Sequence, residues 1–278
     1  MWKKICISGL FILGLGIFLF PIVTNYLNNI VHYNVVESYQ KQVKDLDKKA
    51  LSKKKEEAQA YNKKLTEQAA PVSDPFGKKK QADKIASYGS ILNAGSAMGY
   101  ITIPKIEVEL PIFHGSDDVV LSKGVGHLPN SSLPVGGVGT HAVLTGHRGL
   151  PSATMFRYLN KLKIGDKFYI HTLDNTLAYE VDQILVVLPD ETDALAIDNQ
   201  KDYVTLVTCD PYMINSHRLL VRGHRVAYHP TKAEKKQLTK TKQNPIWQGV
   251  YVFLGVIIVL LVLFLLLGWK RRKRKVKE

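Results

Sequence analysis

The residue best suited to covalent chemistry in this sequence is Cys209. It follows a strand-like run, residues 203–208, and precedes Asp210-Pro211, a pair that breaks a strand. A cysteine at a strand end, before a turn, is well placed to face a cleft. Its thiolate is the attacking form, and a nearby positive charge favours that form. Cys209 is therefore a candidate nucleophile, although a buried and inert thiol is the alternative.

Arg218 is the candidate for the positive charge. Residues 210–217 are enough for a loop that reverses the chain, so Arg218 would open the neighbouring antiparallel strand beside the sulfur of Cys209. A fixed cation at that place stabilises a thiolate and then the oxyanion of a tetrahedral intermediate. The pattern indicates acyl transfer through a cysteine.

Acyl transfer also needs a general acid and base, and histidine is the usual residue. The sequence holds nine histidines. His147 follows a strand-like run, residues 142–145, and strand ends are where a rigid scaffold presents catalytic groups. His141 and His217 are the main rivals. Any single histidine could instead be a surface residue or a hydrogen-bonded structural one.

Three motifs resemble those of sortases, and in particular of the class C branch, which polymerises pilins. Residues 205–223, TLVTCDPYMINSHRLLVRG, resemble the T-L-x-T-C…R signature in its long form. Residues 145–151, TGHRGLP, resemble the histidine motif of that branch. Asp74-Pro75-Phe76 resembles its lid motif, D-P-F/W. The motifs occur in the order found in class C sortases, and the resemblance covers nearly the whole chain.

This resemblance implies a role for each candidate. Cys209 would attack the Thr–Gly bond of an LPXTG-like sorting signal, His147 would protonate the leaving amine, and Arg218 would stabilise the oxyanion. A lysine amine of another pilin subunit would then resolve the acyl-enzyme. Asp210 departs from the family pattern, because threonine usually follows the cysteine. A neighbouring carboxylate would disfavour the thiolate.

The lid motif implies control of the site. Asp74 would pair with Arg218, and Phe76 would cover Cys209, so that the segment with Pro75 at its centre occludes the site at rest. The alternative is a simple turn, since Asp-Pro is common in turns and Phe76 could be a packing anchor.

The sequence predicts that the elements which position these residues are mostly β-strands. Short segments rich in Val, Ile, Leu, Thr and Tyr alternate with Gly, Pro, Asp and Asn, which is typical of a barrel or a sandwich. The resemblance implies a sortase-like eight-stranded β-barrel with short helices, within residues 86–230. A short helix is expected around residues 152–162. The expected strands are residues 100–106, 142–145, 167–172, 177–188, 203–208 and 218–226.

Two apolar runs bracket this region, at residues 5–27 and 245–269. Each is long enough to cross a bilayer. An uncleaved signal anchor is favoured over a cleaved signal peptide for the first run. Lysines and arginines flank the outer ends of both, so residues 1–4 and the basic tail, residues 270–278, should be cytoplasmic. The sequence therefore predicts a multi-pass protein of the cell membrane with its catalytic domain extracellular, and the resemblance to class C sortases implies a Gram-positive cell.

Residues 28–85 are expected to hold an N-terminal amphipathic helix, ended by Pro71, and then the lid motif. The simplest interpretation is a structural role: a solvated helix that packs on the domain or spaces it from the membrane. Residues 231–244 read as a linker to the second span. Apolar residues recur at helical spacing at Tyr39, Val43, Leu46, Ala50, Ala58, Tyr61 and Leu65.

Composition restricts the partners. The formal net charge is +14, but the basic tail directly follows an apolar run, which favours a membrane anchor over nucleic acid. No cluster with zinc-ligand spacing occurs, so we expect no metal and no cofactor. The leading hypothesis is a class C sortase acting on pilin subunits. The alternatives are a housekeeping sortase that anchors proteins to peptidoglycan, and a non-catalytic, membrane-tethered binding module.

Overall fold

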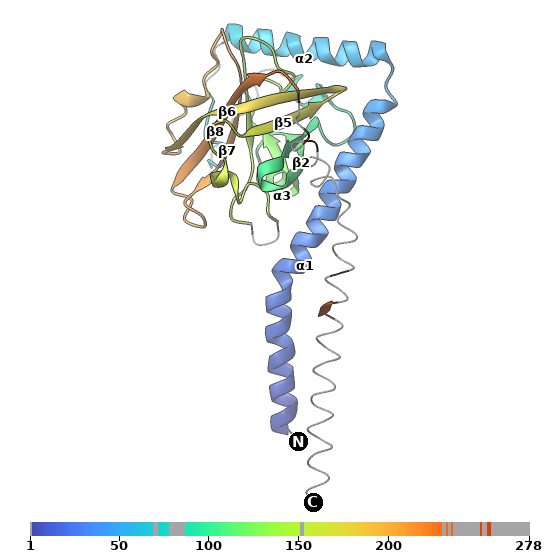
Figure 1. Cartoon of the computed structure of the whole chain (residues 1–278), viewed down its shortest axis with the longest axis vertical. Helices are drawn as coiled ribbons and strands as arrows, with labels where there is room; N and C mark the ends of the chain where they lie inside the picture. Colours follow the sequence, from blue (N-terminus) through green and yellow to red (C-terminus); the bar gives the residue numbers. More distant parts are fainter. Residues whose placement is uncertain are drawn as a thin grey trace, which may run out of the picture. The chain divides into compact units, whose positions relative to one another are not determined.

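The structure, a computed structural model, describes residues 2–68, 72–77, 87–150 and 153–229, with a few isolated positions beyond. Its centre is a closed barrel of eight strands in the order β1-β2-β3-β4-β7-β8-β6-β5, in which β5 pairs with β1 to complete the ring (Figure 1). The strands are β1 (Gly99–Ile103), β2 (Val108–His114), β3 (Val125–His127), β4 (Thr140–Thr145), β5 (Lys167–Thr172), β6 (Asn175–Val187), β7 (Asp202–Asp210) and β8 (His217–Val226).

The expectation of an eight-stranded barrel is confirmed, and the six strands expected from composition lie in it. Two strands were missed. β2 contains Pro111, which lacks the donor that a strand ladder uses, and β3 is only Val125–His127. The helix expected around residues 152–162 is wrong for the described part of that segment, which holds turns and the 3₁₀ turn η3 (Leu159–Lys161).

Other short helical elements lie between the strands. A short helix that the sequence did not suggest, α3 (Asp118–Lys123), is capped by the side chain of Asp117, which accepts from Val120 N at 2.8 Å. Short 3₁₀ turns complete the connections: η1 (Tyr88–Ser90), η2 (Pro104–Ile106) and η4 (Asp193–Leu195).

Side chains alternate between the two faces of the barrel wall. Leu144, Leu206 and Val221 belong to the main core, whereas Val143, Val207 and Leu220 belong to a separate cluster. Successive residues of a strand point to opposite faces, so the second cluster lies on the outer face of the wall. Leu128, Leu195 and the partly buried Phe76 pack over it. This outer face becomes the floor of the candidate site.

The strand pairing brings the ends of three strands to one edge of the barrel. β4 and β7 are parallel neighbours, with Thr145 opposite Val207, so both end at the same edge. β8 is antiparallel to β7 and begins there, with Cys209 opposite Arg218. Residues just after β4, at the end of β7 and at the start of β8 are therefore held close together.

Two helices precede the barrel, α1 (Trp2–Lys44) and α2 (Lys48–Gln68). The single amphipathic helix expected after the first span is wrong in one respect: its first part is continuous with the apolar run in α1. The break comes at Asp47, whose Oδ1 accepts from Ala50 N at 2.7 Å and so caps the start of α2. α2 ends at Gln68, before Pro71, which lies outside the described residues.

Both helices pack on the barrel, which is one of the two arrangements expected from the sequence. Val36, Tyr39 and Val43 of α1 are buried in a cluster with Tyr100 of β1. The hydroxyl of Tyr39 donates to Met98 O at 3.1 Å and accepts from Leu173 N at 2.7 Å. In α2 the buried residues are Ala58, Tyr61, Asn62 and Leu65. The helical spacing of apolar residues marked the packed face at Tyr39, Val43, Ala58, Tyr61 and Leu65, whereas Leu46 lies in the break between the helices and Ala50 is only partly buried.

Among the residues that the structure describes, one helix is long and apolar enough to cross a membrane, within α1 over Gly9–Lys44. The second expected span, residues 245–269, lies outside the described residues except for Tyr251, Gly255 and Val256, which are helical. The basic tail, residues 270–278, lies wholly outside them.

Candidate active site

Cys209 and Arg218 face each other across two strands. They form a directly opposed pair of the β7–β8 ladder, so their side chains leave the wall on the same side. Each is buried, with 8% of its surface exposed. Cys209 lies two residues after Val207, which puts both side chains over the outer floor of apolar residues. One detail of the sequence prediction is corrected: β7 runs through Cys209 to Asp210 and does not stop at Thr208.

His147 reaches the same edge from β4. Hydrogen bonds with β7 fix the backbone just before it: Gly146 N donates to Val207 O at 3.1 Å, and Thr208 Oγ1 donates to Gly146 O at 2.6 Å. The carbonyl of His147 accepts from Phe156 N at 3.0 Å. The imidazole is half-buried. The fold therefore brings the three expected catalytic side chains to one end of the barrel.

The lid motif lies over this end. Both oxygens of Asp74 accept from Arg218, Oδ1 from Nε and Oδ2 from Nη2, each at 2.7 Å. This is a two-point pair, which holds the guanidinium plane as well as its charge. The remaining nitrogen, Nη1, donates to the carbonyls of Asn215 and His217 at 3.0 and 2.9 Å. The guanidinium thus has a full set of partners while Asp74 is in place.

Phe76 lies between two of the expected catalytic groups. Its ring centroid is 5.7 Å from that of His147 and 5.3 Å from Cζ of Arg218. The ring packs on the outer floor of apolar residues, and Pro75 beside it is buried. A cavity of about 120 Å³ adjoins the lid motif, lined in part by Asp74, Pro75 and Leu128. Phe76 therefore fills space between the imidazole and the guanidinium.

The two rival histidines have other surroundings. His141 is 1% exposed, and its ring nitrogens bond to Ala196 O at 2.8 Å and Thr205 Oγ1 at 2.7 Å. It pairs with Tyr203 near the start of β7, far along the strand from Cys209. His217 bonds to Ser216 Oγ at 2.9 Å. As the neighbour of Arg218 in β8, it points to the opposite face.

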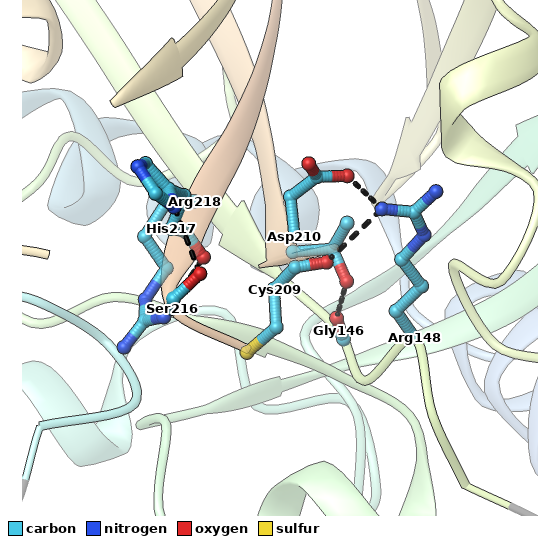
Figure 2. A network of polar contacts seen from close by, with 8 residues as sticks. Gly146, Arg148, Cys209, Asp210, Ser216, His217 and Arg218 are labelled. Atoms are coloured by element: carbon cyan, nitrogen blue, oxygen red, sulfur yellow. Dashed lines mark hydrogen bonds and ion pairs between the residues drawn. The ribbon is translucent and has the colours of Figure 1, made fainter. Parts of the chain in front are cut away.

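Sequence reasoning missed Arg148, which lies beside Cys209. Its Nη1 donates to the carboxylate of Asp210 and approaches the carbonyl oxygen of Cys209 at 3.4 Å. Figure 2 shows Arg148 and Arg218 on opposite sides of Cys209. The signal was present in the sequence as an arginine next to His147 and a carboxylate next to Cys209. Asp210, a carboxylate expected from the sequence to disfavour the thiolate, is paired with Arg148 in the structure.

With the lid motif in place, burial and nearby charges favour the neutral forms of the Cys209 thiol and the His147 imidazole. Burial raises the pKa of the Cys209 thiol, and the Asp74 carboxylate raises it further, while Arg218 and Arg148 oppose both effects. Burial lowers the pKa of His147, and Asp118 on α3 partly offsets this. At neutral pH these directions favour a thiol and a neutral imidazole under the lid.

A larger cavity than the one beside the lid motif lies elsewhere. Its volume is about 850 Å³, and it is lined by residues at the start of β7 and the end of β8, including Asp202, Tyr203 and Arg225. That is the opposite end of the barrel from Cys209. Within the described ranges no group of three His, Cys, Asp or Glu side chains could hold a metal ion.

Comparison with known proteins agrees with the sequence motifs. A family model for the sortase domain matches residues 101–226. Sortase D of Bacillus subtilis (strain 168) is 32% identical over 162 residues, which cover 57% of this chain and 79% of that protein. Sortase A of Bacillus anthracis is 31% identical over 186 residues, which cover 67% of this chain and 85% of that protein.

Solved structures of pilus-related proteins resemble the fold closely. Sortase C of Streptococcus pneumoniae, described in terms of catalysis and pilin substrate specificity, is 45% identical, with a TM-score of 0.66, over 70% of this chain and 97% of that one. Sortase C1 of Pilus Island 1 of GBS is 41% identical, with a TM-score of 0.67, over 72% of this chain and 95% of that one.

Proposed function

Since this chain belongs to the sortase family of cysteine transpeptidases, we propose that it is a class C enzyme that joins pilin subunits, with Cys209, His147 and Arg218 as its catalytic residues. The observation that carries the proposal is the contact of the lid motif with the site. Asp74 holds Arg218 through two hydrogen bonds, and Phe76 lies against His147 and Arg218. The likeness to sortase C structures supports the same choice.

The first half-reaction forms a thioester. Cys209 passes its thiol proton to the neutral His147 as the sulfur attacks the threonine carbonyl of an LPXTG-like sorting signal, and the electrons of the carbonyl pass to its oxygen. Arg218 stabilises that oxyanion through its guanidinium N–H groups. When the intermediate collapses, the C–N bond to glycine breaks, and His147 supplies the proton that the leaving amine takes.

The second half-reaction forms an isopeptide bond. A lysine amine of another pilin subunit attacks the thioester carbonyl and passes a proton to the neutral His147. The C–N bond forms, the C–S bond breaks, and His147 returns the proton to the sulfur, so that Cys209 and His147 recover their starting forms. The same side chains thus serve both halves, and each time His147 takes a proton from the attacking group and gives it to the leaving group.

The lid must move for either half to begin. Asp74 occupies the N–H groups of Arg218 that the oxyanion needs, and Phe76 fills the space between His147 and Arg218. The largely buried Asp74–Arg218 pair contributes about 0–1 kcal/mol net, because desolvation offsets most of its Coulomb gain, and burying part of an aromatic ring gives at most about 1.5–3 kcal/mol. Ordering the segment opposes both. A net bias of ~1–3 kcal/mol toward the closed state corresponds to an open fraction of roughly 1–15%.

The apolar part of α1 supports a membrane location. Its side chains between Leu10 and Val31 include many large exposed apolar residues, which a bilayer would cover. We propose that residues 5–27 anchor the enzyme, that residues 245–269 form a second span, and that the catalytic domain is extracellular.

A reaction in two stages tests the function. The full chain in detergent is first incubated with a peptide that carries an LPXTG-like signal, and the expected product is a thioester on Cys209, seen by mass spectrometry. Addition of a pilin domain should then give a lysine isopeptide. The matched control is Cys209→Ala, which removes the sulfur and leaves the barrel intact.

The outcomes separate the three hypotheses. An adduct on the Cys209→Ala protein would contradict the assigned nucleophile. A thioester that is resolved by a peptidoglycan cross-bridge amine, and not by the pilin lysine, would make the protein a housekeeping sortase. A chain that forms no thioester, with or without the lid mutations described below, would be a binding module.

A further inference from the structure

Each of the two arginines beside Cys209 has its own carboxylate. Arg218 is paired with Asp74, which belongs to the lid motif. Arg148 is paired with Asp210, the residue next to Cys209 on β7 itself. The Arg148 side chain is 8% exposed and that of Asp210 is 22% exposed, so water screens this pair only partly. One pair can separate when the lid moves, and the other stays.

We propose that Arg148 is a positioning residue and a second cation beside Cys209, and that Asp210 balances its charge so that lid opening alone changes the charge around the sulfur. This inference rests on the proposed role of Cys209 as nucleophile. It assigns a purpose to Asp210, the residue at which the chain departs from the family pattern.

The contacts of Arg148 support positioning. Nη1 reaches both the Asp210 carboxylate and the carbonyl oxygen of Cys209, so one side chain holds the last two residues of β7. The backbone of Gly146, two residues before Arg148, is bonded to β7 as well. Arg148 therefore fixes the end of β7 relative to the segment that carries His147.

Charged and titratable groups from several elements lie near Cys209, and Asp210, its neighbour in β7, points to the opposite face of the strand. Arg218 comes from β8, Asp74 from the lid motif, Arg148 and His147 from the segment after β4, and Asp210 from β7. Arg218 and Arg148 both lower the pKa of the thiol, and Asp74 raises it. Removing one member of a buried pair leaves an uncompensated charge near the sulfur.

The proposal predicts opposite effects for the two members of the pair. Arg148→Gln leaves the Asp210 carboxylate unbalanced and should raise the pKa of Cys209. Asp210→Asn keeps an oxygen that can accept from Arg148 but removes the negative charge, so it should lower that pKa. A purely structural clamp would predict the same direction for both, because either change loosens the end of β7.

The experiment measures the rate of Cys209 alkylation by iodoacetamide from pH 5 to 10 in the full chain. The background is Cys6→Ser, which leaves one thiol, with Asp74→Ala, so that lid opening does not limit access. One unbalanced charge near the sulfur in a partly screened site changes the thiolate fraction by about 3- to 30-fold. At pH values below the pKa of Cys209 in the parent, the alkylation rate should fall by that factor in Arg148→Gln and rise by that factor in Asp210→Asn.

Two further variants separate charge from shape. The double variant Arg148→Gln with Asp210→Asn is neutral again, so its pKa should return toward that of the parent, and Arg148→Lys should stay close to the parent. Shifts of the same sign in both single variants, no measurable shift, or a double variant no closer to the parent would each overturn the proposal. Labelling needs no sorting signal, so these results leave the proposed transpeptidation standing. A thiol that reacts in no variant would overturn both.

Discussion

At the scale of single residues, the contact of Arg218 with Asp74 excludes the oxyanion role proposed for Arg218. Its Nε and Nη2 are bonded to Asp74, and its Nη1 is bonded to two backbone carbonyls. An oxyanion can receive hydrogen bonds from the guanidinium only after the carboxylate has left. The closed state is therefore inhibited twice, once because Phe76 fills space and once because the oxyanion donors are occupied.

The two inhibitory contacts can be separated by mutation. Asp74→Ala should speed alkylation of Cys209 by about 5- to 100-fold, from the cost of closure estimated above, and it should also lower the pKa of Cys209, because Asp74 raises it. Phe76→Ala should also raise the rate, but it removes no charge, because the Asp74–Arg218 pair remains, and it changes the pKa of Cys209 only by lessening burial. The measurement is the alkylation rate as a function of pH. Rates equal to wild type in both variants would reduce the segment to a turn.

The catalytic assignments make a separate prediction. His147→Ala and Arg218→Ala should each lower turnover by at least ~10²-fold, the usual scale for losing a positioned proton donor or an oxyanion donor. Arg218→Lys should recover little, because an ammonium cannot reproduce the planar set of donors. His217→Ala is the matched control and should retain near-normal turnover of a sorting-signal peptide. A dead His217→Ala with an active His147→Ala would move the role to His217.

At the scale of the elements, the parallel pairing of β4 with β7 builds the site. Composition predicted both strands, and the positions of Cys209 and His147 at strand ends followed from it. Composition could not predict that the two strands are neighbours, because the pairing joins segments about sixty residues apart and no local pattern records it. The barrel closure likewise came only from the resemblance to sortases. β2 and β3 escaped because a proline and a short length weaken the strand signal.

Contacts across the site were similarly beyond sequence reasoning. Asp210 was interpreted as a charge that acts on the thiol, since it is the neighbour of Cys209 in sequence. Its partner Arg148 lies after β4, and only the β4–β7 pairing brings the two together. The sequence alone identified the carboxylate of Asp210 next to Cys209, whereas only the fold identified Arg148 as the cation that compensates its charge.

His141 gives the barrel a dependence on pH. Burial lowers the pKa of His141 to about 4 from an ordinary value of 6.5. The unfolded chain therefore takes up the proton first as pH falls, and the free energy of unfolding should decrease from pH 6.5 down to about 4. The full effect of this group is about 3 kcal/mol.

A comparison of variants isolates that contribution. Thermal unfolding of the full chain in detergent, followed by circular dichroism between pH 7.5 and 4.5, should show a flatter pH dependence for His141→Gln than for wild type. His217→Gln, whose ring is not buried, serves as the control and should keep the wild-type slope. Equal slopes in all three proteins would contradict the assigned effect of His141.

At the scale of the whole molecule, α1 is part of the catalytic domain. The Tyr39 hydroxyl bonds both Met98 O and Leu173 N, so Tyr39→Phe leaves a buried backbone N–H without that partner. The expected loss of stability is about 1–3 kcal/mol, measured as a lower Tm of the full chain. Tyr33→Phe, on the same helix and outside the buried cluster, is the control. An unchanged Tm in Tyr39→Phe would mean that α1 is only loosely docked.

Topology can be tested on the intact cell. A reporter fused after Glu278 should be cytoplasmic, and a tag within residues 231–244 should be reachable from outside. Replacing the basic residues of the tail with glutamine should weaken retention or orientation of the second span. Cleavage of the tail by protease added to intact cells would contradict two spans.

Under the proposed membrane anchoring, the continuity of α1 also limits where the proposed active site can meet a substrate. A flexible linker of ten residues would let a tethered domain wander by about 17 Å, but α1 runs as one helix from Trp2 to Lys44 and is docked on the barrel from Val36 onward. With residues 5–27 in the bilayer, the stretch from there to Val36 is a helical stem of about 14 Å, without slack. Encounter with substrate is then confined to a plane, because the proposed catalytic centre is held at one fixed height above the lipid. A sorting signal held at that height is met by lateral diffusion, and one released into the surrounding fluid passes out of range.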